Sequence, residues 1–304
     1  MGALESLWDK FTENPERNSK IMGLIFIIQL LPLVYPLGFP IKYSFYTTDL
    51  YNLIEGGPMS YGVVEPGLQP DDIFVYGDQA EHVGDYSAHR DMWSTLVRWI
   101  AGEKQIRMIC AWFGFSSITV FTDIWERYMK PYNLEYGVDY VWTEYLPAGE
   151  ASMSYFAEHT GTTLDALYHQ PINSYPGFTD VEDFHDVAMA MGTVIRTTDH
   201  DMYIRAWGTQ WPNVKYILRG EYAIGLAYYG QAVRAVTQYD FEIEHIVGTT
   251  YGSKFFGEEI TKIESKELWA IMYIPLLIWG LFVNWKRQIA EGVSLTPRVG
   301  ERGQ

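Results

Sequence analysis

The sequence has almost no cysteine and none of the short motifs that usually reveal an enzyme. Its single cysteine, Cys110, excludes an intrachain disulfide and lies in the apolar run IRMICAWF, where a small buried side chain is the simplest interpretation. The chain contains no G-x-S-x-G nucleophile turn and no G-x-x-x-x-G-K-[ST] phosphate loop, and no G-x-G-x-x-G turn follows its first predicted strand. These absences leave no recognisable covalent nucleophile and no phosphate cradle at that strand.

Positive charge is also scarce. The chain has 22 Lys and Arg against 38 Asp and Glu, and its formal net charge is −16 at pH 7. Most of the negative charge lies between the two apolar segments described next. A domain this acidic is repelled by phosphate backbones, so nucleic acid is excluded as a partner. The charge suits divalent cations or a basic protein instead.

Two segments lack charged side chains altogether, residues 21–41 and 268–285. A helix needs roughly 20 apolar residues to cross a bilayer core, so each segment predicts a transmembrane helix. The alternative for either segment is a helix buried in a protein core. No small-x-small cleavage site follows the first segment, which favours an uncleaved anchor over a signal peptide.

The chain therefore divides into six parts. These are a tail (1–20), a transmembrane helix (21–41), a linker or irregular strap (42–70), an α/β domain (71–265), a second transmembrane helix (268–285) and a basic tail (286–304). The tails carry more Lys and Arg than the two flanks of the domain, and such residues usually stay in the cytoplasm. We expect a two-pass protein of the cell membrane, with both tails cytoplasmic and the domain outside the cytoplasm.

Between the apolar segments, short apolar runs alternate with amphipathic stretches. Strands are predicted at 72–76, 106–113, 140–145, 184–191, 214–218 and 244–247, and helices at 85–102, 116–130, 150–159, 201–209, 221–235 and 253–263. Strands separated by helices imply right-handed crossovers and a parallel sheet. The pattern predicts an α/β domain with three layers, a mainly parallel sheet and a Rossmann-like or flavodoxin-like fold.

Polar side chains follow the first and fourth predicted strands, at the sheet edge where parallel sheets bind ligands. The first of these loops carries Asp78, Glu81 and His82, and the second carries Asp199 and His200. Carboxylates and imidazoles suit Zn, Mn or Fe, and carboxylates alone suit Mg or Ca. Their spacing matches no metal motif, and solvated loops that cap helices explain them more simply. We expect no cofactor, although a divalent metal is compatible with these residues.

A second candidate lies near the end of the domain. Gly252, Ser253 and Lys254 precede the predicted helix at 253–263, where backbone N–H groups at a helix start can bind an anion. A tight turn before a helix explains the same residues equally well.

Three stretches of the domain carry a resemblance. They are DDIFVYGDQA at 71–80, YGVDYVWTEYLPAGEA at 136–151 and IEHIVGTTYGSKFFGEE at 243–259. Together they resemble an uncharacterised prokaryotic family of membrane-anchored proteins with a Rossmann-like extramembrane domain. The chain departs from that family's pattern at Ala148 and at Phe255 and Phe256. The resemblance implies the fold and membrane attachment, and it implies no catalytic residues.

Two functions are compatible with these features. The absence of a catalytic set and the abundance of Tyr and Trp favour a structural or assembly subunit of a membrane complex, attached to the lipid bilayer and forming homo-oligomers or binding other subunits. The alternative is a metal-dependent enzyme or a small-ligand sensor that uses the carboxylate and histidine loops at the sheet edge.

Overall fold

The structure is a computed structural model, and it describes only part of the chain. It covers residues 25–28, 30, 42–79, 90, 92–147, 149–193, 201–219, 235–237 and 240–252, together with scattered positions between 268 and 285. The chain forms two compact units, one of Met1–Pro40 with Gly257–Gln304 and the other of Ile41–Phe256.

No helix within the described residues is both long enough and apolar enough to cross a bilayer. The transmembrane helices predicted at 21–41 and 268–285 lie mostly outside those residues, so they stay predictions.

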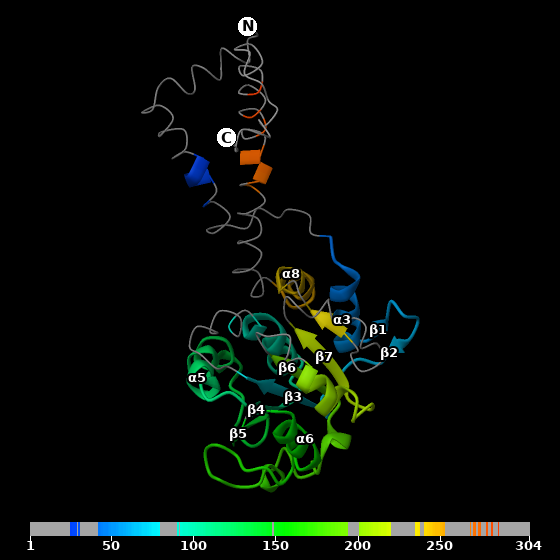
Figure 1. The fold of residues 1–304 in the computed structure, drawn as a ribbon, viewed down its shortest axis with the longest axis vertical. Coiled ribbons are helices and arrows are strands. Elements are labelled where there is room, and N and C mark those ends of the chain that lie inside the picture. The colour runs from blue at the N-terminus through cyan, green and yellow to red at the C-terminus, as the bar shows by residue number, and fades with distance from the viewer. Residues whose placement is uncertain are drawn as a thin grey trace, which may run out of the picture. The chain divides into compact units, whose positions relative to one another are not determined.

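A six-stranded parallel sheet forms the centre of the larger unit (Figure 1). Its strands are β3 (Ile73–Asp78), β4 (Arg107–Trp112), β5 (Tyr140–Tyr145), β6 (Met189–Thr193), β7 (Lys215–Arg219) and β8 (Ala235–Thr237). Their spatial order is β5-β4-β3-β6-β7-β8, and every neighbouring pair is parallel. Numbered along the chain, this order is 3-2-1-4-5-6, which is that of doubly wound Rossmann-type sheets. The predicted α/β class with a parallel sheet is confirmed.

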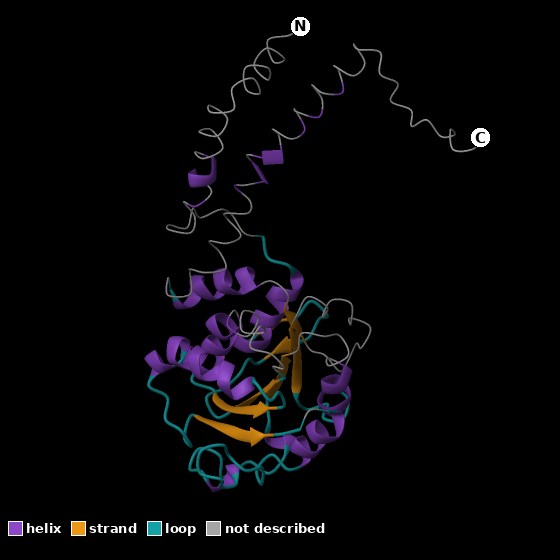
Figure 2. Ribbon diagram, turned by 60° about the vertical axis from the view of Figure 1, so that its left-hand side comes forward, coloured by secondary structure: helices purple, strands orange, loops and turns teal. Residues whose placement is uncertain are grey.

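Helices cover both faces of the sheet, which gives three layers (Figure 2). One face packs against α3 (Phe45–Glu55), η2 (Trp93–Glu103), α5 (Ser117–Tyr128) and α8 (Asp240–Tyr251). The other face packs against α6 (Glu150–Glu158) and η6 (Ile204–Gly208). Both η2 and η6 are π-helical. The helix predicted at 85–102 is described only from its second half, and it continues to Glu103.

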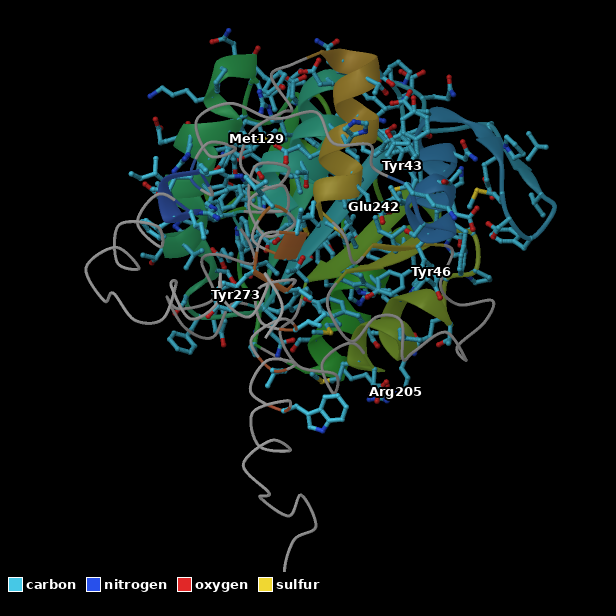
Figure 3. The ribbon with its side chains drawn as sticks, turned by 90° about the horizontal axis from the view of Figure 1, so that it is seen from above. Tyr43, Tyr46, Met129, Arg205, Glu242 and Tyr273 are labelled. Atoms are coloured by element: carbon cyan, nitrogen blue, oxygen red, sulfur yellow. The ribbon has the colours of Figure 1, made fainter. Side chains whose placement is uncertain are left out.

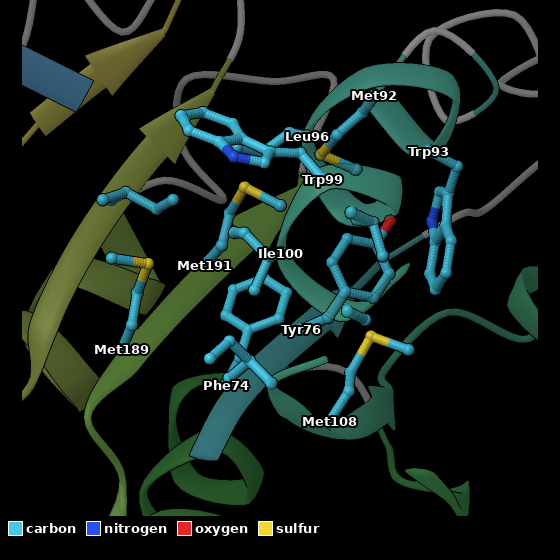
Figure 4. Packing of buried hydrophobic residues seen from close by; sticks show 14 of the residues in the cluster. Phe74, Tyr76, Met92, Trp93, Leu96, Trp99, Ile100, Met108, Met189 and Met191 are labelled. Atoms are coloured by element: carbon cyan, nitrogen blue, oxygen red, sulfur yellow. The ribbon is translucent and has the colours of Figure 1, made fainter. Parts of the chain in front are cut away.

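The central strand β3 is buried along its whole length and divides its side chains between two cores. Phe74 and Tyr76 belong to the core beneath η2 and α5 (Figure 4), whereas Ile73 and Val75 belong to the core beneath α6 and η6. A strand covered on both faces needs an almost continuous apolar run, which is why β3 could be predicted from the sequence. Cys110, on neighbouring β4, is fully buried, as predicted.

Two predicted strands differ from the structure. Residues 244–247, predicted as a strand, lie within helix α8. The strand predicted at 184–191 begins only at Met189, because Phe184–Asp186 form a 3-10 turn. In that turn Asp183 and Asp186 form a capping box and take up backbone N–H groups that a strand would need.

Two further differences between prediction and structure concern the first and last parts of the larger unit. Strand β8 was not predicted, and it begins at Ala235, the last residue of the helix predicted at 221–235. The segment 42–70, predicted as a linker or strap, contains α3 and a short hairpin. Leu50, Leu53 and Ile54 of α3 are fully buried, so this segment belongs to the core.

Two buried or half-buried carboxylates join α3 to its neighbours. At its start, Glu242 Oε2 accepts hydrogen bonds from Ser44 N (2.8 Å), Ser44 Oγ (2.7 Å) and Thr47 Oγ1 (2.5 Å). At its end, Glu55 accepts from Trp99 Nε1 of η2 (2.6 Å) and Tyr251 Oη of α8 (2.7 Å). Figure 3 shows Glu242 and Tyr43 beside α8. Helix α3 is therefore attached at both ends to α8.

Candidate functional site

The strand order reverses between β3 and β6, so their carboxyl ends form the topological switch point of the sheet. In open α/β sheets, ligands bind outside the carboxyl ends of the strands at this point. Asp78 and Gln79 lie at the end of β3, and Thr193 lies at the end of β6. All three are buried. Three buried polar side chains therefore lie at the switch point, where the topology predicts a ligand site.

Asp78 is the centre of a hydrogen-bonded group. It is only 3% exposed, its Oδ2 accepts from Tyr76 Oη (2.7 Å), and its Oδ1 accepts from Ser117 Oγ at the start of α5 (2.8 Å). Its backbone oxygen also accepts from Phe113 N (2.7 Å), which fixes the loop after β4. These contacts hold the carboxylate in place at the end of β3.

The register of the sheet places the residues beside Asp78. Asp78 pairs with Trp112 of β4 on one side and with Thr193 of β6 on the other. The same row continues to Tyr145 on β5 and to Arg219 on β7. Residues of four types, aromatic, acidic, hydroxyl-bearing and basic, therefore occupy equivalent register positions in neighbouring strands at the carboxyl edge of the sheet.

Two buried polar atoms at this edge have no hydrogen-bond partner in the described part of the chain. One is the acceptor Gln79 Oε1, next to Asp78 in sequence, and the other is the donor Trp112 Nε1, opposite Asp78 in register. Buried polar atoms are nearly always paired, and an unpaired one costs about 1–3 kcal/mol. Within the described residues, Gln79 therefore has an unpaired acceptor next to Asp78 in sequence, and Trp112 has an unpaired donor next to Asp78 in register.

The Tyr76 hydroxyl stays protonated in this setting. Burial raises the pKa of Tyr76 well above its usual range, and the nearby Asp78 carboxylate raises it further. Tyr76 lies among Met92, Trp93 and Met191 (Figure 4) and donates to Asp78. Burial likewise raises the pKa of the Cys110 thiol, with Asp78 adding to the effect, so Cys110 is no thiolate nucleophile.

Two glycines let η6 approach the sheet just before the switch point. A Cβ on Gly77 would lie 2.5 Å from Trp207 Cη2, and a Cβ on Gly192 would lie 2.6 Å from Tyr203 Cγ. Both aromatic side chains are fully buried against these glycines. The close packing explains why each strand has a glycine immediately before its last residue.

The structure places only some of the predicted site residues. Asp78 occupies the carboxyl edge, as predicted. Glu81, His82, Asp199 and His200 lie outside the described residues, in the segments that leave the neighbouring ends of β3 and β6. Among the described residues, no group of three His, Cys, Asp or Glu side chains is arranged to hold a metal ion.

The predicted anion site is described only at Gly252. This residue follows α8, has a φ of 93°, and donates its N–H to Gly248 O (2.9 Å). It therefore closes the carboxyl end of a helix, where free carbonyls repel anions. Ser253 and Lys254 lie outside the described residues, and their role as an anion site stays a prediction.

Sequence reasoning did not single out Tyr76, Trp112, Ser117 or Thr193. Each lies near the end of a strand or at the start of a helix, so its position along the chain could have identified it as a candidate for the carboxyl edge. Their meeting at Asp78 depends on strand order and register, which single-sequence patterns do not give.

A second buried carboxylate has a different role. Asp165 Oδ2 accepts from Tyr136 Oη, Leu167 N and Tyr168 N, and its Oδ1 accepts from Gln170 N, all at 2.8–2.9 Å. Burial acts to raise its pKa, but these hydrogen bonds outweigh that effect and hold the pKa at about 2. Three of these donors are backbone N–H groups of the same loop and the fourth is Tyr136 of a distant segment, so Asp165 is a structural anchor.

Comparisons with known proteins give no relatives. No family model, no curated protein and no solved structure matches this chain. The resemblance at 71–80, 136–151 and 243–259 therefore stays a prediction, and the function must be argued from the carboxyl edge itself.

Proposed function

We propose that this chain is a membrane-attached protein whose Ile41–Phe256 unit binds a small polar ligand at the carboxyl ends of β3 and β6. The observation that carries the proposal is the buried Asp78 carboxylate at the switch point, together with two buried atoms of neighbouring residues, Gln79 Oε1 and Trp112 Nε1, that have no partner within the described residues. The predicted apolar segments at 21–41 and 268–285 supply the membrane attachment.

The chemistry of these groups favours a ligand rich in hydroxyl or amino groups. Asp78 and Gln79 Oε1 accept hydrogen bonds, so the ligand must donate to them, and Trp112 Nε1 donates, so the ligand must also carry an acceptor. A phosphate group is disfavoured, because the carboxylate repels it and no glycine-rich turn follows β3. Sugars, polyols and amino acids meet these requirements.

Calorimetry on the full chain in mild detergent tests the proposal. The panel is a hexose, a polyol, an amino acid and NAD, the last as the phosphate-bearing probe. We expect binding of at least one of the first three and none of NAD. Asp78→Asn should weaken binding by about 10–100-fold, which is the value of a hydrogen bond to a charged group.

Thr122→Val is the matched control, because Thr122 is exposed on α5 and its hydroxyl donates to Ile118 O of the same helix (2.9 Å). It should leave affinity and melting temperature unchanged. Binding of NAD alone, or an affinity that Asp78→Asn does not change in a folded protein, would contradict the proposal.

A second candidate function is assembly, as a subunit that packs on copies of itself or on other membrane subunits. The favouring observation is a group of exposed apolar side chains, Leu164, Leu167 and Tyr168, on the loop that Asp165 holds rigid. A preordered apolar loop loses little entropy when it is buried in an interface.

Mass measurement in detergent at micromolar concentration separates the two candidates. If assembly through this loop is right, the wild type is oligomeric and Leu167→Glu is monomeric, while Tyr155→Glu on α6 stays oligomeric. A monomeric wild type, with no adduct after cross-linking in native membranes, would exclude assembly and leave ligand binding unaffected.

A further inference from the structure

A hairpin projects from the unit directly after α3. It is formed by β1 (Gly57–Pro58) and β2 (Val64–Glu65), which pair antiparallel, and Met59 N donates to Val63 O (2.7 Å) across the turn. Figure 1 shows it standing out from the helices and the sheet beside α3. Met59 at its base is buried in the core, so the projecting part is the tip beyond Met59.

The base of the hairpin is held firmly. Asp49 of α3 is buried and accepts from both the backbone N (2.7 Å) and the hydroxyl of Ser60. Asn52 Nδ2 donates to Pro58 O (2.6 Å), and Glu65 pairs with Lys215 at the start of β7 (3.1 Å). These contacts fix the direction in which the tip points.

The tip is apolar and exposed. Tyr61 is 48% exposed, Val63 is 49% exposed, and Val64, at 73%, has the largest exposed fraction among the large apolar side chains described. No charged residue occurs from Gly56 to Val64, although the chain carries a net charge of −16. A rigid hairpin that presents three uncharged apolar side chains to water gains stability when a partner covers them.

We propose that this tip, Tyr61, Val63 and Val64, inserts into the interfacial region of the lipid bilayer. The proposal rests on the membrane attachment stated under Proposed function. The predicted anchor at 21–41 ends four residues before α3, and α3 has 11 residues. At about 1.5 Å per helical residue and about 3.5 Å per extended one, the base of the hairpin lies within about 30 Å of the anchor's end along the chain, and the tip at Tyr61 lies within about 50 Å.

Charge and residue type also favour lipid as the occupant. Anionic lipid headgroups repel an acidic protein surface. An uncharged tip is repelled least, so it is the part of that surface that can approach the headgroups most easily. Tyrosine is enriched at membrane interfaces, where its ring sits in the apolar boundary and its hydroxyl in the headgroup layer. A second copy of the chain would need a larger apolar face than these three side chains form.

Fluorescence quenching in nanodiscs tests the proposal on the full chain. Val64→Cys and Tyr155→Cys are each labelled with bimane and placed in phosphatidylcholine nanodiscs that contain a lipid with a nitroxide near its headgroup. Tyr155 is the control, because it is 60% exposed on α6, which covers the opposite face of the sheet from α3. Cys110 is fully buried and should remain unlabelled.

We expect quenching at position 64 to exceed that at position 155 by about twofold or more, because interfacial insertion brings the label among the headgroups. Equal quenching at the two positions would overturn the proposal while leaving membrane attachment intact. Absence of lipid quenching, together with a disulfide between unlabelled Val64→Cys chains under a mild added oxidant, would assign the tip to a second copy and would overturn it too. A chain that does not incorporate into nanodiscs would overturn the membrane attachment itself.

Discussion

Single carboxylates explain much of how this chain is built, and they differ in where they lie. Asp165 holds a loop through three backbone N–H groups and joins it to Tyr136. Asp78 lies at the switch point of the sheet, where Tyr76 and Ser117 donate to it. The first position stabilises a loop, whereas the second is where open α/β sheets bind ligands.

The role of Asp165 predicts a pH-dependent loss of stability. Its pKa in the folded protein is about 2, below the ordinary value of 3.8, so its stabilisation is complete above about pH 4 and is lost as the pH falls toward about 2. Asp165→Asn should lower the free energy of unfolding by about 2–4 kcal/mol at neutral pH, since it removes hydrogen bonds to a buried charge.

Urea denaturation of wild type and Asp165→Asn at about pH 6 and about pH 3 measures this effect, and the difference between them should shrink at the lower pH. Glu126→Gln is the control, because its pair with Lys130 is exposed on the surface and should change stability by less than about 0.5 kcal/mol. A difference between wild type and Asp165→Asn that stays constant over this pH range would contradict the assignment.

Gly77 gives a second prediction at this scale. An alanine there would bring its Cβ within 2.5 Å of Trp207, so Gly77→Ala should cost about 1–3 kcal/mol of stability through overpacking. Trp207→Leu shortens the opposing side chain and should recover part of that cost in the double variant, which a double-mutant cycle measures. Strictly additive effects would show that the two residues do not oppose each other.

At the scale of elements, the first three strands and the helices α5 and α6 lie close to their predicted bounds. Strands β3 and β4 are buried on both faces and need apolar runs, whereas the edge strand β5 alternates between buried and partly exposed residues. The strand predicted at 244–247 lies within α8, because the pattern of so short a run does not separate a strand from a helix. Glu242 is buried for a tertiary reason, since it accepts from Ser44 and Thr47.

The candidate site was predictable only in its location. Asp78 could be placed at the end of the first strand from its position in the sequence. Thr193 and Trp112 became its neighbours only through the order and register of β4, β3 and β6. These depend on packing between distant segments, which local patterns do not contain.

The contact between Glu242 and α3 predicts local opening. Glu242→Ala should expose the start of α3 and speed hydrogen exchange of the amides at its first turn, at a cost of about 1–3 kcal/mol, because Thr47 would lose its buried partner. Thr48→Val is the control, since Thr48 is exposed and its hydroxyl bonds only locally to Ser44 O. Unchanged exchange in α3 would show that Glu242 does not hold this helix.

At the scale of the whole molecule, the compact unit is covalently continuous with both apolar segments. Helix α3 begins four residues after the segment 21–41, and α8 ends 17 residues before the segment 268–285. The basic residues of the two tails predict that both segments cross the same membrane with their tails on the cytoplasmic side.

That expectation can be tested by the accessibility of single cysteines. Cysteines at positions 5 and 300 should be shielded from an impermeant thiol reagent in intact cells, because the basic tails are predicted to be cytoplasmic. Tyr155→Cys should react, because Tyr155 is 60% exposed on the domain, and the fully buried Cys110 should stay silent. Permeabilised cells, in which all three introduced cysteines should react, provide the control. Labelling of the two tails but not of position 155 would reverse the orientation, and labelling of one tail alone would show that only one segment crosses the bilayer.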